Sequence, residues 1–303
     1  HRWRYTNRTC GENAMNDPNI VILAGGISSR MRNIPSASVG LDPILLKETR
    51  QKSKSMLSVG RGTRPFMDYI LYNIREAGYK NVVIVVGDKD NSIGDYYNLQ
   101  GGAKKFIELN IDYVTQTIPG GRTKPLGTAD ALLTALKSKP GWRGKSFTVC
   151  NSDNLYSVKA LRLLLIDTHK NSMIDYDRSG LQFDHSRIEA FAVLQKDENG
   201  FLVDLIEKPT ANGITQIKDD VGRIGVSMNI FRLSYDMIFP YLETIPLHPM
   251  RYEKELPLAV KIMVEKCPKC MMTIPLSEHV IDLTHQSDIN QVKEYLEIEF
   301  PHF

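Results

Sequence analysis

Short apolar runs of the length of a β-strand alternate with helical patterns along the first half of this chain. Asn19–Leu23, Asn81–Val86 and Ser146–Cys150 are almost continuously apolar, which is typical of strands that are buried on both faces. Residues 65–77 and 128–137, which lie between them, carry apolar side chains at helical spacing. Strands that alternate with helices form a largely parallel sheet covered by helices on both faces. We therefore predict an α/β fold with a Rossmann-like, mixed but mostly parallel sheet flanked by helices.

The same criteria predict further elements along the chain. A third strand is expected at Ile111–Thr115 and a helix at about Val158–His169. The second half changes character, and its expected strands are Ile188–Leu194, Leu202–Ile206, Gly225–Phe231, Met271–Leu276 and Val280–Leu283. Its expected helices are Tyr235–Leu242, Tyr252–Glu265 and Ser287–Leu296. Residues 33–53 and 117–125 carry no strong pattern, so we expect loops there, and long loops at strand ends often hold functional residues.

Length and charge narrow the classes of protein that this chain can belong to. Its 303 residues suffice for one large α/β domain with a substantial core. The net charge is only +3, from 38 basic and 35 acidic residues, which does not indicate a nucleic-acid or membrane surface. No apolar run reaches the roughly 18–20 residues of a membrane span. We therefore expect neither nucleic acid nor a membrane as a partner.

The N-terminal segment and the cysteines bear on domain organisation and location. Residues 1–14 start with basic side chains but lack the apolar segment of a secretory signal, so we expect a tag or a disordered extension. Residues 15–303 are expected to form a single domain. Four cysteines without an export signal fit a reducing cytoplasm. Cys267 and Cys270 form a CxxC pair without a second pair, which favours two ordinary thiols over a zinc site.

The strongest candidate for a ligand site follows the first strand, in the run Leu23–Met31 (LAGGISSRM). Glycines such as Gly25 and Gly26 let the backbone approach a nucleotide closely, and free N–H groups can hold phosphates. Arg30 adds a cation whose planar fork matches phosphate oxygens. A glycine pair alone is also consistent with a simple bend, but the arginine four residues later favours a phosphate site.

Polar residues that follow the other expected strands supply further candidates. Asp153, after the fourth strand, offers a carboxylate suited to a hard cation such as Mg²⁺ that bridges phosphates. Gln116 ends the third strand, and an amide can bond both a donor and an acceptor on a base. Gly127 and Thr128 open a helix whose first N–H groups are free to bind an anion. Asp130 in the first turn of that helix needs no function.

In this order along the chain, the motifs resemble those of the sugar-1-phosphate nucleotidyltransferases, such as glucose-1-phosphate thymidylyltransferase and adenylyltransferase catalytic domains. The family's loop LAGGxGTRL is similar to LAGGISSRM, with Ser28 and Ser29 in place of glycine and threonine. LGTADA at 126–131 is especially like the ADP-glucose pyrophosphorylases, and Glu207-Lys208-Pro209 matches the family's Glu-Lys-Pro. The resemblance spans about residues 18–290 and implies a GT-A-like nucleotidyltransferase fold.

The resemblance also implies the role of each matching residue. The implied nucleotide-binding residues are Leu23, Ala24, Gly25, Gly26, Gln116, Gly127 and Thr128. The implied catalytic cations are Arg30, Lys54 and Lys208, and the implied sugar-binding residues are Glu207, Ala192 and Asn229. The implied Mg²⁺ ligands are Asp153 and Asp282. Residues 18–155 would then form a nucleotide-binding half and residues 156–303 a sugar-binding half.

Two of these assignments leave alternatives open. Lys54 lies in a segment that is longer than the family's, so Lys47 and Lys52 compete for its role. Asp282 lacks the tryptophan and glycine that flank the family's second Mg²⁺ ligand, and Asp288 is the alternative.

The activity implied by the resemblance is the Mg²⁺-dependent condensation of an NTP with a sugar 1-phosphate to an NDP-sugar and pyrophosphate. Alternatives are a nucleotidyltransferase for another phosphate acceptor, which Glu207-Lys208-Pro209 disfavours, and a catalytically silent regulatory homologue. The sequence fixes neither the sugar, the base nor the oligomeric state, and a homo-oligomer is compatible with it.

Overall fold

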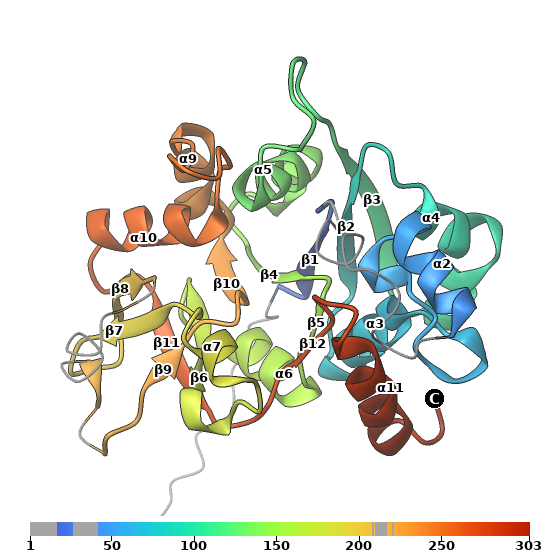
Figure 1. Ribbon diagram of the computed structural model, residues 1–303. Coiled ribbons are helices and arrows are strands. Elements are labelled where there is room, and N and C mark those ends of the chain that lie inside the picture. The colour runs from blue at the N-terminus through green and yellow to red at the C-terminus, as the bar shows by residue number, and fades with distance from the viewer. Residues whose placement is uncertain (1–16, 27–41, 208, 210–216, 220) are drawn as a thin grey trace, which may run out of the picture.

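A mixed sheet of ten strands runs through the part of the chain that the computed structural model describes, which is residues 17–26, 42–207, 209, 217–219 and 221–303 (Figure 1). The strand order is β3-β2-β1-β4-β10-β6-β9-β7-β8, and β11 pairs with β6 outside this path. The strands are β1 Asn19–Ala24, β2 Asn81–Gly87, β3 Asn110–Gln116, β4 Ser146–Asn151, β6 Ser172–Asp177, β7 Val193–Lys196, β8 Leu202–Ile206, β9 Gly225–Val226, β10 Phe231–Ser234 and β11 Met272–Leu276. A separate pair joins β5 Asn154–Leu155 to β12 Ile281–Asp282.

Helices lie on both faces of this sheet. They are α2 Pro43–Gln51, α3 Phe66–Ala77, α4 Ser92–Gly94, α5 Thr128–Ser138, α6 Val158–Ile166, α7 His185–Ile188, α9 Tyr235–Thr244, α10 Leu256–Lys266 and α11 Asp288–Glu299. Short 3₁₀ helices are η2 Lys54–Met56, η3 Arg61–Thr63, η5 Gly102–Phe106, η6 Pro140–Trp142 and η7 Arg178–Gly180, and η4 Asp95–Leu99 is a π-helix. The predicted mixed sheet flanked by helices is confirmed.

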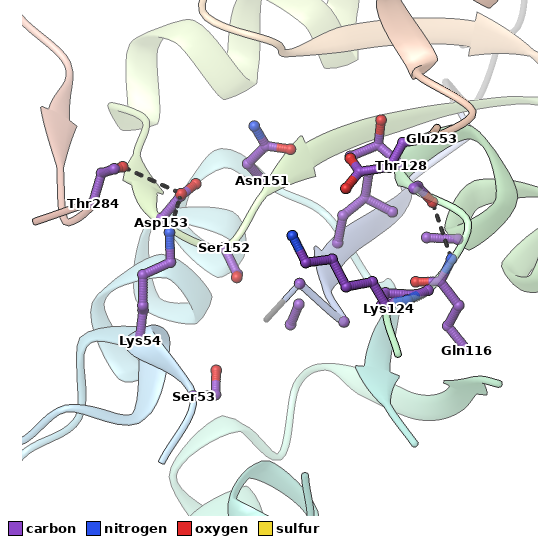
Figure 2. A pocket seen from close by; sticks show the side chains of 17 residues that line it. Ser53, Lys54, Gln116, Lys124, Thr128, Asn151, Ser152, Asp153, Glu253 and Thr284 are labelled. Carbon is purple, nitrogen blue, oxygen red and sulfur yellow. Dashed lines mark hydrogen bonds and ion pairs between the residues drawn. The ribbon is translucent and has the colours of Figure 1, made fainter. Parts of the chain in front are cut away.

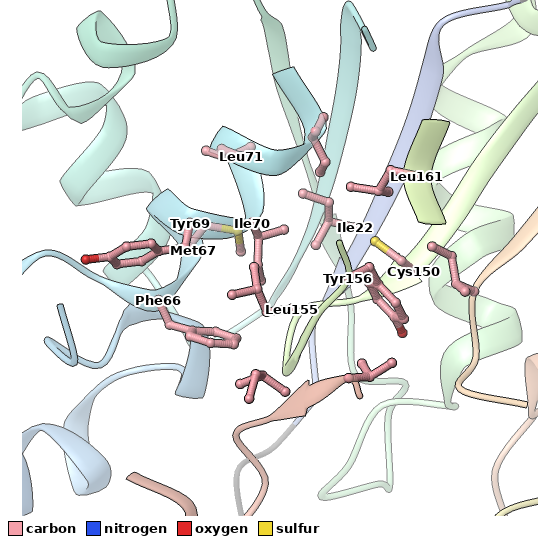
Figure 3. Close-up of a cluster of buried hydrophobic side chains, with 14 of the residues drawn as sticks. Ile22, Phe66, Met67, Tyr69, Ile70, Leu71, Cys150, Leu155, Tyr156 and Leu161 are labelled. Atoms are coloured by element: carbon pink, nitrogen blue, oxygen red, sulfur yellow. The ribbon is translucent and has the colours of Figure 1, made fainter. Parts of the chain in front are cut away.

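The first four strands are parallel; β1, β2 and β4 are largely buried on both faces, whereas β3 is partly exposed at the edge of the sheet. β1 pairs with β2 and β4, and β2 pairs with β3, always in parallel. Ile20 and Ile22 point into a core shared with α3 and α6 (Figure 3), whereas Val21 and Leu23 point into a second core beneath α5, α9 and α10. This two-sided burial is why the strand sequences are continuously apolar. Because parallel strands end at the same edge, the residues after β1, β3 and β4 meet there.

The end of the chain returns to this parallel part of the sheet. β12 pairs antiparallel with β5, so that Asp282 lies opposite Asn154. Beyond α11, the Phe300 ring packs edge-on against Tyr69 of α3, with 5.0 Å between ring centroids. The segment around Asp282 therefore lies beside the loop that follows β4, although more than 120 residues separate the two in sequence.

Four predicted elements of the second half differ from the structure. The strand predicted at Ile188–Leu194 was wrong, because α7 extends to Ile188 and β7 starts only at Val193. The strand predicted at Gly225–Phe231 is broken into β9 and β10 by a turn in which Asn229 has a φ of +56°. The helix predicted from Tyr252 begins at Leu256, since Tyr252 itself has a φ of +54°. The helix predicted to end at His169 ends at Ile166.

Among the elements that were absent from the prediction, α2 and β6 are the longest. Within the segment expected to be a loop, α2 begins at Pro43, and the Asp42 side chain accepts a hydrogen bond from the Ile44 N–H at 2.8 Å. A capping aspartate followed by proline is an ordinary helix start. The strand β6 was missed because a buried carboxylate, Asp175, interrupts its apolar pattern; Lys196 donates to that carboxylate at 2.7 Å.

Candidate functional site

A cavity of about 350 Å³ opens at the carboxyl ends of β1, β3 and β4 (Figure 2). It is lined by all seven residues predicted to bind a nucleotide, namely Leu23, Ala24, Gly25, Gly26, Gln116, Gly127 and Thr128. Lys54 and Asp153 line it as well. A ligand in this cavity would therefore contact five segments that are far apart in the sequence, at the edge of the sheet where α/β proteins bind ligands.

Two glycines of this site lie close to neighbouring atoms. Gly127, directly before α5, has a φ of +113°, and a Cβ there would lie 2.6 Å from the Lys254 carbonyl oxygen. A Cβ on Gly25 would lie 3.0 Å from Gln116 Oε1, which is a tight contact. Glycine is needed at position 127 because both its backbone conformation and the nearby Lys254 backbone exclude a side chain.

Lys54 reaches Asp153 across the cavity, with 2.7 Å between Nζ and Oδ2. Both side chains are mostly buried, at 17% and 21% exposure, so solvent screens this ion pair only in part. Of the competing lysines, Lys52 pairs with Glu48 at 2.6 Å, and Lys47 lies exposed on α2. Lys54 is thus the one of these three lysines that lines the cavity.

Asp153 and Asp282 lie close together through a shared partner. The Thr284 hydroxyl is 2.5 Å from Asp282 Oδ1 and 3.4 Å from Asp153 Oδ2. Burial, followed by the negative charge of Asp153, raises the pKa of Asp282, and Arg187 offsets part of this with a contact of 2.8 Å. Two carboxylates that repel each other in a buried position are a setting that a cation would stabilise.

The alternative residue, Asp288, has a different environment. It pairs with Arg187 at 2.8 Å and accepts hydrogen bonds from the Thr284 and His285 N–H groups at 2.9 and 2.7 Å. Asp288 therefore holds the turn before α11, and Asp282 is the carboxylate that shares a partner with Asp153.

The three predicted sugar-binding residues lie outside the lining of this cavity. Ala192 is joined to the turn that contains Asn229, because its carbonyl accepts from the Ser227 N–H at 2.9 Å. Asn229 has a positive φ, which asparagine tolerates better than most residues. Glu207 is half-exposed and pairs with Arg251 at 3.1 Å.

Two predicted catalytic cations, Arg30 and Lys208, lie outside the described residues. Their assignment stays a prediction.

Several lining residues were missed, and they come mainly from two segments. Lys124 stands two residues before LGTADA, where a cation beside a helix start could have been noticed. Glu253 enters from the segment before α10, which is fixed to the start of α5 because Lys254 N–H donates to the Leu126 carbonyl at 2.5 Å. Nothing in the sequence indicates a contact across more than 120 residues. Ser53, Asn151, Ser152 and Thr284 complete the polar lining.

The part of the chain that the structure describes holds neither a cluster of metal ligands nor a membrane-spanning helix. Within it, no three or more histidine, cysteine, aspartate or glutamate side chains are grouped so as to hold a metal ion. No helix in the same residues has the length and apolar character needed to cross a membrane.

Comparison with protein families and curated proteins points to nucleotidyl transfer. A family model described as nucleotidyl transferase matches residues 19–219. The chain is similar to glucose-1-phosphate adenylyltransferase of Photobacterium profundum, with 26% identity over 227 residues, 74% of this chain and 50% of that protein. A glucose-1-phosphate adenylyltransferase of Vibrio cholerae is 25% identical over 194 residues, 63% of this chain and 43% of that protein. The chain spans about half the length of the curated relatives it matches.

Solved structures share the fold. A UDP-glucose pyrophosphorylase complexed with UDP-glucose superposes with a TM-score of 0.65 at 19% identity, over 93% of this chain and 98% of that one. The UTP-bound UGPase from Acinetobacter baumannii gives a TM-score of 0.66 at 16% identity, over 94% of each chain.

Proposed function

This chain belongs to the nucleotidyl transferase family, and on that premise we propose that it transfers a nucleoside monophosphate unit from an NTP to a sugar 1-phosphate and releases pyrophosphate. The observation that carries the proposal is one cavity whose lining brings together separate segments of the chain. They contribute the glycine turn Gly25-Gly26, the Gln116 amide, Lys54 and Asp153. The glycine turn and the start of α5 suit a nucleotide, because close backbone approach and helix N–H groups both favour phosphates. The names of the curated relatives support the choice of a sugar phosphate as acceptor.

The reaction needs little covalent chemistry from the protein. An oxygen of the sugar 1-phosphate forms a bond to the α-phosphorus of the NTP, and the bond from that phosphorus to the bridging β-oxygen breaks, so that pyrophosphate leaves. A phosphate is already a competent nucleophile, so no general base is required. Lys54 and Lys124, which both line the cavity, would hold the polyphosphate and offset its charge as it departs. We propose that Arg30, outside the described residues, contributes a further cation.

We propose Asp153 and Asp282 as the residues that hold Mg²⁺. The raised pKa of Asp282, caused by burial and then by Asp153, supports this fit, because a divalent cation relieves the repulsion between two neighbouring carboxylates. Bound there, Mg²⁺ would supply charge neutralisation for the triphosphate. Lys54, 2.7 Å from Asp153, orients that carboxylate in this arrangement.

The acceptor side of the proposal rests on residues beyond the cavity lining. Glu207, whose carboxylate pairs with Arg251, would accept hydrogen bonds from sugar hydroxyls, and Arg251 would add a cation for the sugar's phosphate. Ala192 and Asn229 would line the sugar, with Lys208 beside its phosphate. We further propose a cytoplasmic location, which the free thiols of Cys150, Cys267 and Cys270 support.

Pyrophosphate release tests the activity. The protein is incubated with Mg²⁺, one of ATP, CTP, GTP, UTP or TTP, and a panel of sugar 1-phosphates. We expect release with at least one pair of substrates, and its loss in Asp153→Asn. Asn199, in a turn on the surface between β7 and β8, supplies the matched control Asn199→Asp, which should leave the rate unchanged.

The outcome also separates the two rival functions. Turnover with a phosphate acceptor that is not a sugar would replace the proposed acceptor class. Nucleotide binding without release from any pair would instead favour a catalytically silent regulatory homologue.

A further inference from the structure

The side-chain amide of Gln116 is held in one orientation at the wall of the cavity (Figure 2). Its Nε2 lies 3.0 Å from the Gly127 carbonyl oxygen and 2.8 Å from Asp130 Oδ2. A backbone carbonyl and a carboxylate accept hydrogen bonds but donate none. The NH₂ end of the amide must therefore face both of them, and the usual ambiguity between the oxygen and nitrogen of a glutamine does not arise.

This orientation leaves the other end of the amide for a ligand. Both hydrogens of Nε2 are engaged, and Oε1 points to the glycine turn, where a Cβ on Gly25 would lie 3.0 Å from it. No residue in the described part of the chain donates a hydrogen bond to Oε1. Gln116 and Gly25 both line the main cavity and a smaller adjoining cavity of about 130 Å³. Gln116 as a whole is only 2% exposed, so its side chain is held in place and the end of the amide that is left for a base is the acceptor Oε1.

The acceptor Oε1 decides what the amide can bind. The Asp130 carboxylate and the Gly127 carbonyl occupy the Nε2 end of the amide, so neither hydrogen of Nε2 is left for a ligand. A ligand oxygen placed against the amide would face the Oε1 oxygen instead of a donor, whereas an amino group would find an acceptor there.

Nucleobases differ in what they offer to such a wall. Uracil and thymine place their one ring N–H between two carbonyl oxygens, so an amide pairs with them well only if it accepts and donates together. Here the donating end is occupied. Guanine carries a carbonyl at the ring position where adenine carries an amino group. Adenine and cytosine instead present an amino group at C6 and C4, which suits the acceptor Oε1, whereas the amino group of guanine lies at C2.

We propose that Asp130 is a positioning residue that fixes Gln116 as a pure acceptor, and that the site thereby selects an NTP whose base carries an amino group at C6 of a purine or C4 of a pyrimidine, ATP or CTP, over UTP and TTP. The inference rests on the proposed function, because it requires the base of an NTP to lie against Gln116. Asp130 does not touch the nucleotide in this account and acts through the amide alone.

Nucleotide binding to the full chain tests the proposal. Dissociation constants of ATP, CTP, UTP and TTP are measured by calorimetry with Mg²⁺, and kcat/KM for pyrophosphate release is measured in parallel. The wild-type protein should bind ATP or CTP at least about tenfold more tightly than UTP and TTP, which corresponds to one hydrogen bond of about 1.4 kcal/mol. In Asp130→Leu the amide is free to turn, and the preference should fall to within about threefold.

Two matched variants distinguish orientation from simple structural damage. Asp130→Asn keeps one acceptor oxygen at the same place and should retain most of the preference. Thr134 lies one turn along α5, where its hydroxyl bonds the Asp130 backbone carbonyl at 2.9 Å, and Thr134→Ala should leave the preference unchanged. Circular dichroism establishes that each variant folds.

Three outcomes of these measurements decide whether Asp130 sets the base preference through Gln116. Wild-type protein that binds UTP or TTP as tightly as ATP and CTP would overturn the proposal without any variant. A folded Asp130→Leu protein that keeps the full wild-type preference would overturn it too. If the preference and its loss in Asp130→Leu are both observed in binding, the proposal stands even where no sugar 1-phosphate gives pyrophosphate, and only the proposed transferase activity then fails.

Discussion

Replacing Gly127 by alanine probes the junction on which the cavity depends. Gly127 has a φ of +113° and a ψ of −173°, a backbone region that is essentially restricted to glycine. The alanine Cβ would also lie 2.6 Å from the Lys254 carbonyl oxygen and 3.0 Å from the Lys254 nitrogen. Both atoms belong to a backbone that is held by hydrogen bonds to Leu126 and Ala129, so neither can move freely.

The two effects add to a substantial loss of stability. Backbone strain of this kind costs about 1–3 kcal/mol, and forcing an extra methyl group against packed atoms costs about another 1–3 kcal/mol. We therefore expect Gly127→Ala to lower the free energy of unfolding by about 2–6 kcal/mol, out of the roughly 5–15 kcal/mol that typical domains possess. At a urea slope of about 3 kcal/mol per molar, the midpoint falls by about 1–2 M.

Urea unfolding followed by circular dichroism measures this loss, with Gly120→Ala as the matched control. Gly120 lies in the loop between β3 and α5, its φ is not positive, and a Cβ there would meet nothing within 4 Å. The control should shift the unfolding free energy by no more than about 0.5 kcal/mol. Nucleotide affinity should also fall in Gly127→Ala, because a displaced Lys254 moves the adjacent cavity residue Glu253. Equal urea midpoints for the two variants would refute the reasoning.

Three further predictions concern a proposed catalytic lysine, a carboxylate and a buried hydroxyl. Lys54→Met should lower kcat/KM for pyrophosphate release by about 100-fold or more, and a smaller loss in steady-state assays would argue against its role. Burial alone would raise the pKa of Glu48, but hydrogen bonds from Lys52 and Ser58 outweigh it and lower that pKa. The stabilisation is therefore present above the ordinary glutamate pKa and is lost as pH falls through the folded value. Glu48→Gln should thus cost about 1 kcal/mol at pH 7 and much less at pH 3 in urea titrations, and equal losses at both pH values would contradict this. Tyr79 is fully buried and its hydroxyl contacts Thr148 Oγ1 at 2.7 Å, so Tyr79→Phe should cost about 1–2 kcal/mol, and an unchanged melting temperature would disprove it.

The first half of the fold could be predicted because its strands are buried on both faces. The bounds of β1, β2 and β4 agree with the predicted ranges to within one residue, since two-sided burial leaves a continuous apolar run. β6 shows the opposite case. Its buried Asp175 is stabilised by Lys196 and Arg223, each 2.7 Å away, and partners from segments distant in sequence do not show in a local pattern.

The residues of the candidate site also differ in how far they could be predicted from the local sequence. Residues that directly follow a strand, such as Gly25, Gln116 and Asp153, could be predicted because parallel strands end at one edge. Glu253 could not be predicted, because it reaches the cavity only through backbone hydrogen bonds between segments that are distant in sequence. The orientation of Gln116 by Asp130 also needed the structure, since an aspartate in the first turn of a helix is ordinary in sequence.

The return of β12 to β5 has a consequence for how the protein matures during synthesis. Asp282 and Thr284 reach Asp153 only after the chain has been made through residue 284. A nascent chain on the ribosome can form the parallel strands and the glycine turn much earlier, because these lie in its first half. A chain that has been made only as far as residue 280 would then lack the Asp282 and Thr284 side chains beside Asp153. Translation thus imposes an order on this molecule, in which Asp153 is synthesised more than 120 residues before Asp282.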